Sequence, residues 1–315
     1  MSRNDPLGKR LQRRASLKRL LLAALAPTAL FASGFAAAQP APTNPLRVVA
    51  SFSILADMVR EIGGNAVEVT SLVAPDSDAH IFEPSPADAQ RLARADLVVV
   101  NGLGFEGWME RLVRASGYRG ALVVASKGVT PRTLGKQVDP HAWQNLANAA
   151  IYADNIRDGL IAKLPAQRAP IEQRAAAYRS RIETLDRLTH ARFNELPAER
   201  RRVITSHDAF GYFGDAYQVR FIAPLSWNTD SEASASDVAR LIRQIKGDAV
   251  SALFVENITD PRLLRRIAGE AGVKVGGTLY SDALSSASGP ASTYLDLMAH
   301  NADTLRAAMQ PPSGR

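Results

Sequence analysis

The chain alternates short apolar runs with amphipathic helical patterns, in two sets that a much longer helical pattern separates. The runs lie at 47–51, 67–72, 97–101 and 121–125 in the first set, and at 202–205, 219–222, 252–256 and 274–278 in the second. Short apolar strands that alternate with helices are typical of βαβ units and a mostly parallel sheet. The sequence therefore predicts an α/β fold with two parallel-sheet lobes.

The segment between the two sets reads as one long helix. From Pro170 to Leu196, apolar residues recur every three or four positions, and the opposite side is charged, which we interpret as a solvated face. Gly and Ser do not cluster there, so we expect a rigid connector rather than a flexible linker. The predicted organisation is an N-terminal lobe at 39–165, a connecting helix at 166–197 and a C-terminal lobe at 198–315, with a single crossing between lobes.

The formal net charge of +7 comes almost entirely from the start of the chain. Residues 1–38 hold seven Lys and Arg residues and one acidic residue, which leaves 31 basic and 30 acidic residues in the rest. A chain so close to neutral gives no support to a nucleic-acid partner.

Residues 1–38 have the pattern of a cleavable export signal. A basic stretch precedes the apolar segment Leu20–Phe35 and the small residues Ala36–Ala38. Arg13–Lys18 resembles a twin-arginine signal, although Ser16 stands where that motif usually has a bulky apolar residue, so the general secretory route stays open. The apolar segment is too short and interrupted for a membrane span. We expect a periplasmic protein without a stable membrane anchor.

Four residues lie in turn-rich segments after these apolar runs: His80, His141, His207 and Asp282. Ligands of open parallel sheets bind beyond the carboxyl ends of the strands, so two facing lobes would form a cleft there, with two of these residues from each lobe. Three imidazoles and one carboxylate are the ligands of a four-coordinate transition-metal site, with zinc as the first candidate. The chain has no cysteine, which excludes thiolate ligands and a lipid-modified cysteine.

Taken singly, each of the four residues also has an ordinary explanation as a solvated loop residue, a turn former or a cap. Asp208 could orient the neighbouring imidazole of His207, but we expect it to cap the following helix. His190 and His300 fall within helical patterns and are interpreted as helix-surface residues. Recurrence at four strand ends is what favours a shared site.

Other chemistries have weaker signals. Asn101–Gly104 lacks the spacing of a dinucleotide-binding loop, and the neighbours Ser206–Asp208 point in different directions, unlike a catalytic triad. A zinc-dependent hydrolase would use three of the four residues as ligands and Glu256 or Glu83 as general base. A structural or adhesive surface protein is a third alternative. Four protein ligands leave no open position for an activated water, which favours binding over catalysis.

Several stretches resemble the metal-specific solute-binding proteins of bacterial ABC transporters. They are DAHIFEPSPADAQRLARADLVVVNGLGFEGWMERL, VDPHAWQNLANA, SHDAFGYFGDAY, and FVENITDPRLLRRIAGEAG with GGTLYSDALS. The resemblance covers essentially residues 46–309. It implies two α/β lobes joined by one long helix and a metal held between them by His80, His141, His207 and Asp282. It also implies a transmembrane permease subunit as partner.

The resemblance bears on the choice of metal as well. Manganese-binding relatives commonly carry a carboxylate at the position of His207, whereas zinc-binding relatives carry histidine. Three nitrogens and one carboxylate also suit Zn²⁺ better than the harder Mn²⁺. The loop Ser126–Val138 lacks the histidines that many zinc-binding relatives have there. We predict a monomeric, non-enzymatic Zn²⁺-binding protein, with a manganese- or iron-binding member of the same family as the alternative.

Overall fold

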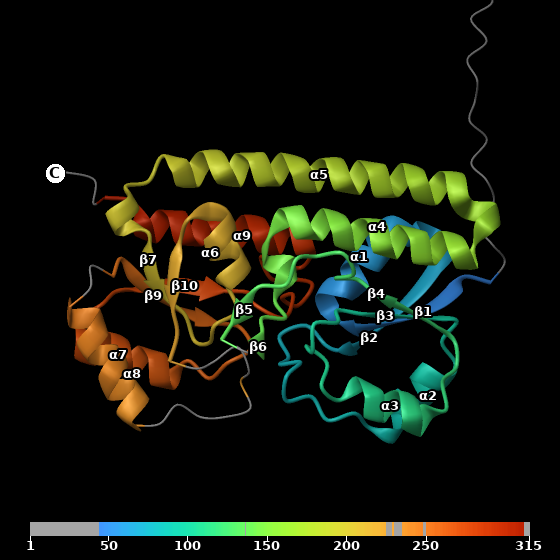
Figure 1. Cartoon of the computed structure of the whole chain (residues 1–315), viewed down its shortest axis with the longest axis horizontal. Helices are drawn as coiled ribbons and strands as arrows, with labels where there is room; N and C mark the ends of the chain where they lie inside the picture. The colour runs from blue at the N-terminus through green and yellow to red at the C-terminus, as the bar shows by residue number, and fades with distance from the viewer. Residues whose placement is uncertain (1–43, 136, 225–228, 230–234, 248–249, 312–315) are drawn as a thin grey trace, which may run out of the picture. The chain divides into compact units, whose positions relative to one another are not determined.

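The structure is a computed structural model, drawn in Figure 1, and describes residues 44–135, 137–224, 229, 235–247 and 250–311. The predicted export signal at 1–38 lies outside the described residues. Within the described part, no helix combines the length and the apolar character needed to cross a membrane.

The first lobe is built on a four-stranded parallel sheet with the order β2–β1–β3–β4. Its strands are β1 (Leu46–Phe52), β2 (Val67–Val73), β3 (Leu97–Val100) and β4 (Ala121–Val124), and its helices are α1 (Ser53–Gly63), α2 (Pro86–Ala93) and α3 (Met109–Ser116). Strand β3 and most of β1 are buried, which explains why they read as continuous apolar runs.

The second lobe repeats this topology with the order β10–β9–β7–β8, again all parallel. Its elements are β7 (Arg202–Ile204), α6 (Gly211–Tyr217), β8 (Arg220–Ile222), α7 (Ala235–Gly247), β9 (Ala252–Glu256), α8 (Arg262–Ala271), β10 (Val275–Leu279) and α9 (Tyr294–Met309). In chain order, the first strand of each sheet lies between the second and the third. The predicted α/β class with two parallel sheets is confirmed.

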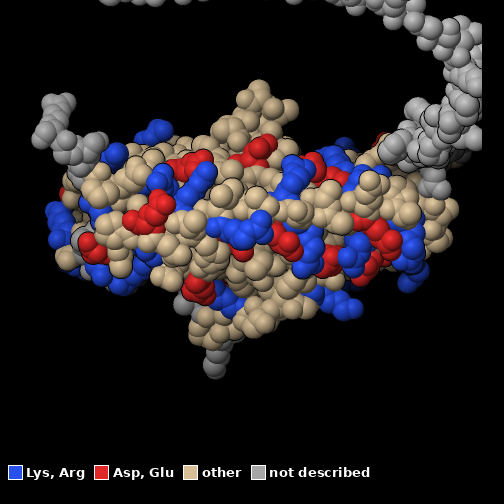
Figure 2. Space-filling model, turned by 90° about the horizontal axis from the view of Figure 1, so that it is seen from above, with Lys and Arg blue, Asp and Glu red and all other residues tan. Residues whose placement is uncertain are grey.

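The long connecting helix is also confirmed, as α5 (Arg168–Asn194), which runs over α4 (Leu146–Lys163) and α9 in Figure 1. Its buried side includes Tyr178 and Phe193. Figure 2 views the molecule from above, onto the outer face of α5, and shows basic and acidic side chains interspersed over that face. On the surface of α5, Arg179 pairs with Glu183 at 2.9 Å. This charged face is the solvated surface that the sequence predicts.

Two features depart from the expected organisation. The loop before His141 contains a small antiparallel hairpin, β5 (Thr133–Leu134) with β6 (Gln137–Val138). In addition, the chain after β10 returns to the first lobe, where Tyr294 N donates to Asp57 Oδ2 of α1 at 2.8 Å. The long helix is therefore not the single crossing between lobes that the sequence suggests.

One apolar core extends through both lobes. It joins side chains of the first sheet, such as Val99, with Phe213 of α6 and Leu297 of α9. A smaller cluster, with Leu241 of α7 and Ile267 of α8, covers another part of the second lobe. The lobe boundaries expected at 39–165, 166–197 and 198–315 remain a proposal.

Candidate metal centre

The structure brings the four predicted ligand residues together. The nearest ligand atoms of His80, His141, His207 and Asp282 all lie within 4.8 Å of one another. Nε2 of His80 is 3.3 Å from Nε2 of His141 and 3.1 Å from Asp282 Oδ2. Nε2 of His207 is 3.1 Å from the same Oδ2 atom, and Nε2 of His141 is 3.6 Å from Asp282 Oδ1. Three imidazole edges and one carboxylate thus face a common point.

Three of these residues lie in loops that follow the carboxyl ends of parallel strands, and His141 lies beyond the hairpin in the loop that follows β4. His80 lies between β2 and α2, His207 comes shortly after β7, and Asp282 follows β10. His141 precedes a short 3₁₀ turn, η2 (Ala142–Gln144), that leads into α4. Parallel strands place their carboxyl ends at one edge of a sheet, so the facing edges of two such sheets supply all four loops.

The loop that carries His80 ends at a well-defined cap. Ser85 caps α2 reciprocally with Asp88, and Pro86 occupies the first helical position. The indole of Trp108 donates to the carbonyl oxygen of Ala79 at 2.9 Å, next to His80 itself. Local sequence therefore fixes where this loop turns back from the centre.

The spacing of the ligand atoms fits a four-coordinate ion. Metal–ligand bonds of about 2.0–2.1 Å in tetrahedral geometry place neighbouring ligand atoms about 3.3 Å apart. The contacts that Asp282 makes with the three imidazoles range from 3.1 to 3.6 Å, and all four ligand atoms lie within 4.8 Å of one another. Asp282 Oδ1 is buried and has no hydrogen-bond partner among the described residues, as expected for an oxygen that a cation would satisfy.

The centre is closed to solvent. The side chains of His141, His207 and Asp282 are fully buried, and that of His80 is 4% exposed. Aromatic rings form part of the wall, with Trp143 at 5.3 Å from the ring centre of His141. Trp143 is itself fully buried, so its indole helps to exclude water from the centre.

Two carboxylates orient two of the imidazoles. Asp139 Oδ1 lies 2.8 Å from Nδ1 of His141, and Glu256 Oε2 lies 2.6 Å from Nδ1 of His207. A carboxylate at Nδ1 keeps the proton there and leaves Nε2 free for a metal. Glu256 Oε1 also accepts from the backbone nitrogens of Ser206 and His207 at 2.7 and 3.0 Å.

Sequence reasoning missed these two roles. Asp139 lies two residues before His141, a spacing that could have suggested an orienting carboxylate, whereas Glu256 is distant in sequence and was considered only as a general base. The prediction that Asp208 caps a helix is wrong, because α6 begins at Gly211 and its first turn has no side-chain cap.

The remaining histidines and Glu83 lie away from the centre. His190 is exposed on α5, and Glu83 is exposed beyond the His80 loop. His300 is half-buried on α9, where Nε2 lies 3.1 Å from the carbonyl oxygen of Thr278. None of these three belongs to the group of converging ligand residues found in the described chain.

The electrostatics of the centre favour a bound cation. Burial lowers the pKa of His207, but the carboxylates of Glu256 and Asp282 outweigh it and raise this pKa well above the ordinary value. Burial likewise raises the pKa of Asp282, yet His141 and His207 outweigh it and hold this pKa well below the ordinary range. A metal that enters must therefore displace a proton from an imidazole.

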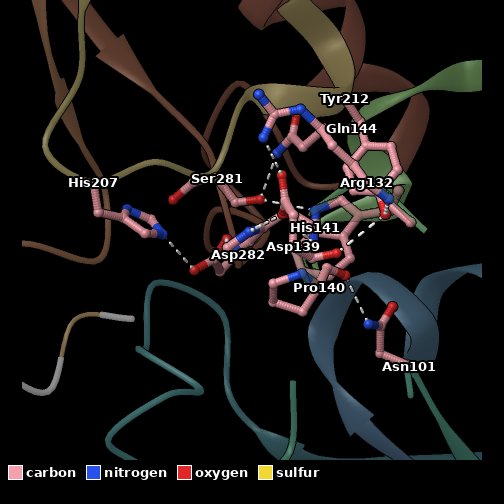
Figure 3. A network of polar contacts seen from close by, with 12 residues as sticks. Asn101, Arg132, Asp139, Pro140, His141, Gln144, His207, Tyr212, Ser281 and Asp282 are labelled. Carbon is pink, nitrogen blue, oxygen red and sulfur yellow. Dashed lines mark hydrogen bonds and ion pairs between the residues drawn. The ribbon is translucent and has the colours of Figure 1, made fainter. Parts of the chain in front are cut away.

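A polar network surrounds His141 and reaches the second lobe (Figure 3). Arg132 Nη1 lies 3.1 Å from Asp139 Oδ2, and Arg132 Nε donates to Asp215 of α6 at 3.0 Å. Tyr212 accepts from the backbone nitrogen of Arg132 at 2.8 Å and donates to the carbonyl oxygen of Asp139 at 3.1 Å. A Cβ atom on Gly211 would lie 2.4 Å from Arg132 Cζ, so this glycine permits the close approach.

Comparison with known proteins places this chain in a family. A family model described as the periplasmic component A of a zinc-uptake complex matches residues 48–308. A solved structure of the periplasmic zinc-binding protein TroA from Treponema pallidum superposes with a TM-score of 0.82 and 29% identity, covering 85% of this chain and all of that one.

Curated relatives carry the names of other metals. The manganese-binding lipoprotein MntA of Halalkalibacterium halodurans is 32% identical over 261 residues, which are 82% of this chain and 87% of that protein. The iron-binding protein YfeA of Yersinia pestis is 30% identical over 297 residues, which are 91% of this chain and 95% of that protein. These similarities give no support to the hydrolase alternative, and Glu256 faces an imidazole nitrogen in this structure. The chain belongs to the exported metal-binding proteins that serve as substrate-binding components of metal ABC transporters, and it is not an enzyme.

Proposed function

We propose that this protein captures Zn²⁺ in the periplasm and delivers it to the transmembrane permease of an ABC importer. The proposed ligands are Nε2 of His80, His141 and His207 and the carboxylate of Asp282. One observation carries the proposal: these atoms converge in a closed site at separations that suit a four-coordinate ion.

The donor set favours zinc over harder ions. Three imidazole nitrogens and one carboxylate suit borderline Zn²⁺, whereas Mn²⁺ prefers more oxygen ligands. The two nearby carboxylates that could add oxygen are engaged elsewhere, because Asp139 faces His141 Nδ1 and Glu256 faces His207 Nδ1. With these partners in place, Asp282 supplies the carboxylate of the centre.

Manganese or iron is the second candidate. The relatives named for these metals share about a third of their residues with this chain. A structural observation also favours it, since Asp282 Oδ1 is buried and lacks a hydrogen-bond partner among the described residues. A bidentate Asp282 would add a fifth ligand atom and suit an ion that prefers oxygen.

Metal analysis distinguishes the two candidates. We expect protein purified without added metal to contain one zinc per chain. In a chelator competition titration, we expect the affinity for Zn²⁺ to exceed that for Mn²⁺ by orders of magnitude. A preference for Mn²⁺ or iron in the same titration would transfer the assignment to those ions. Absence of any stoichiometric metal would contradict the metal site itself.

The delivery step rests on the family and on the proposed export signal. We propose that residues 1–38 direct export and that the mature protein is a monomer that meets the permease with its metal bound. Light scattering on the mature protein tests the monomer, and growth of a deletion strain in zinc-depleted medium tests uptake. Growth restored by zinc but not by manganese would support the assignment.

A further inference from the structure

Asp282 follows a strand of the second lobe, but the chain around it is bound to the first lobe. The carbonyl oxygen of Ser281 accepts from Trp143 Nε1 at 3.0 Å and from Gln144 Nε2 at 2.7 Å. On the other side of Asp282, the backbone nitrogen of Leu284 donates to Oγ of Ser53 at 3.0 Å. Hydrogen bonds from the first lobe therefore fix the chain both before and after the carboxylate.

Asp76 reinforces this attachment. Its backbone nitrogen donates to the carbonyl oxygen of Leu284 at 2.9 Å, and its Oδ2 accepts from the backbone nitrogen of Ser286 at 3.0 Å. Asp76 has a left-handed backbone with φ of 54°, a conformation that non-glycine residues adopt rarely, although Asp tolerates it better than most. Residues 281–285 are all buried. The Asp282 loop is thus bound mainly to the first lobe, and from the second lobe Asn257 donates to the carbonyl oxygen of Ala283 at 3.3 Å.

His207 is attached differently. Its backbone nitrogen donates to Glu256 Oε1 at 3.0 Å, and its carbonyl oxygen accepts from Thr205 Oγ1 at 3.1 Å. Its Nδ1 faces Glu256 Oε2 at 2.6 Å. Glu256 ends β9 and Thr205 follows β7, so these contacts all lie within the second lobe. In Figure 3, a dashed line joins the imidazole of His207 to Asp282.

We infer that His80, His141 and Asp282 form a three-ligand half-site on the first lobe, and that His207 is the exchangeable fourth ligand. This inference rests on the proposed function for the identity of the ligands. It replaces the expected division of two ligands per lobe with a division of three and one. Ser53, Asp76 and Gln144 are positioning residues, because they act on the metal through the Asp282 loop.

The division gives the site an order of assembly. A zinc ion on three protein ligands keeps one open position, which water or another donor can occupy. Arrival of His207 closes the tetrahedron, and departure of His207 opens it while the other three ligands stay in place. Because the two lobes share an apolar core, this exchange would take place by a small shift of the second sheet rather than by a wide separation of the lobes.

Double-mutant cycles with Zn²⁺ and a competing chelator test the inference. His207→Ala is expected to weaken binding by orders of magnitude but to keep one zinc per chain. Gln144→Leu is expected to weaken binding about tenfold, and by the same factor in the His207→Ala background. Glu256→Gln should weaken binding in the wild-type background and have no further effect once His207 is absent.

Two measurements separate positioning from general destabilisation. Ser53→Ala and Gln144→Leu should change the visible absorption of bound Co²⁺, whereas Ser71→Ala, which removes a hydroxyl bonded within β2, should not. Thermal melting of the metal-free variants identifies any that are unfolded. Asp76→Asn then takes the place of such a variant, because asparagine keeps an acceptor and tolerates a left-handed φ. Loss of the Gln144→Leu effect in the His207→Ala background would overturn the inference. Failure of the wild-type protein to bind zinc would instead overturn the proposed function.

Discussion

Glu256 Oε2 lies 2.6 Å from Nδ1 of His207, on the opposite side of the imidazole from the Nε2 atom that faces Asp282. The same glutamate accepts two backbone hydrogen bonds through Oε1, so both its position and its orientation are fixed. This pair connects the end of β9 with the end of β7. It makes Glu256 a determinant of how well His207 can serve as a ligand.

Glu256→Gln is therefore expected to lower zinc affinity about 10–100-fold. A glutamine keeps the acceptor for the two backbone nitrogens but presents an amide donor to Nδ1. That donor favours the tautomer with its proton on Nε2, which cannot bind a metal. Chelator competition measures the loss. Glu83→Gln is the matched control, since Glu83 is exposed and should leave the affinity unchanged.

Ligand removal gives a second contrast between two histidines. His207→Ala deletes a fully buried group of the centre and should weaken zinc binding by orders of magnitude. His190→Ala removes an exposed imidazole on α5, next to Tyr217, and should have almost no effect. Isothermal titration with Zn²⁺ compares the two. Equal losses in both variants would show that the ligand assignment is wrong.

Zinc affinity should fall as the pH falls. The carboxylates of Glu256 and Asp282 raise the pKa of His207 above its ordinary value of about 6.5, so protons compete with the metal already near neutral pH. The expected decline starts above about pH 6.5 and is accompanied by proton release on binding. Titrations in buffers of different ionisation enthalpy measure the released protons. An affinity that stays constant between about pH 8 and pH 6 would contradict this coupling.

Much of the fold was predictable because strand runs and helix periodicity are local. The runs at 67–72 and 252–256 became β2 and β9 with almost the same bounds, and the long pattern from Pro170 became α5. The position of Asp282 after a strand was equally visible. Its attachment to Ser53 was not, because a hydrogen bond between residues so far apart in sequence leaves no periodic pattern.

The orienting carboxylates show the same limit at the site. Asp139 is only two residues before His141, so its role could be inferred from the local sequence. The proline between them also restricts the backbone of the turn. Glu256 reaches His207 only through the pairing of β7 with β9. Its role therefore depends on sheet order, which the strand pattern alone does not determine.

Asp57 gives a prediction about stability. Burial raises its pKa from 3.8 to about 6, against the opposing hydrogen bond from the backbone nitrogen of Tyr294. Between pH 3.8 and about pH 6, Asp57 is protonated in the folded state but ionised in the unfolded state. The free energy of unfolding therefore falls as the pH rises through this window. Asp57→Asn keeps an acceptor and carries no charge. It should raise the free energy of unfolding by about 1–3 kcal/mol at pH 7.5.

Denaturant unfolding at two pH values measures this effect. The gain from Asp57→Asn should shrink at about pH 4, where the wild-type carboxyl is protonated in the folded state. Asp303→Asn is a suitable control. Asp303 lies on α9, like Tyr294, but it is exposed and pairs with Arg192 of α5. A loss of stability at pH 7.5 that disappears at about pH 4 would show instead that Asp57 is needed as an anion beside α9.

Gly211 supports the final prediction, which concerns the network around His141. Gly211→Ala would place a Cβ atom 2.4 Å from Arg132 Cζ and 2.7 Å from Asp139 Oδ2. The guanidinium is the flexible end of a side chain, so it should move away and leave the fold intact. Asp139 would then lose the partner that holds it against His141.

Zinc affinity should therefore fall by about tenfold in Gly211→Ala and by a similar factor in Arg132→Gln. The two changes combined should have little more effect than either alone, because both break the contact between Arg132 and Asp139. Gly269→Ala on α8 is the matched control, since a Cβ atom there meets nothing within 4 Å. Chelator competition gives the affinities. Full additivity of the two changes would mean that Gly211 acts on the centre by a route other than Arg132.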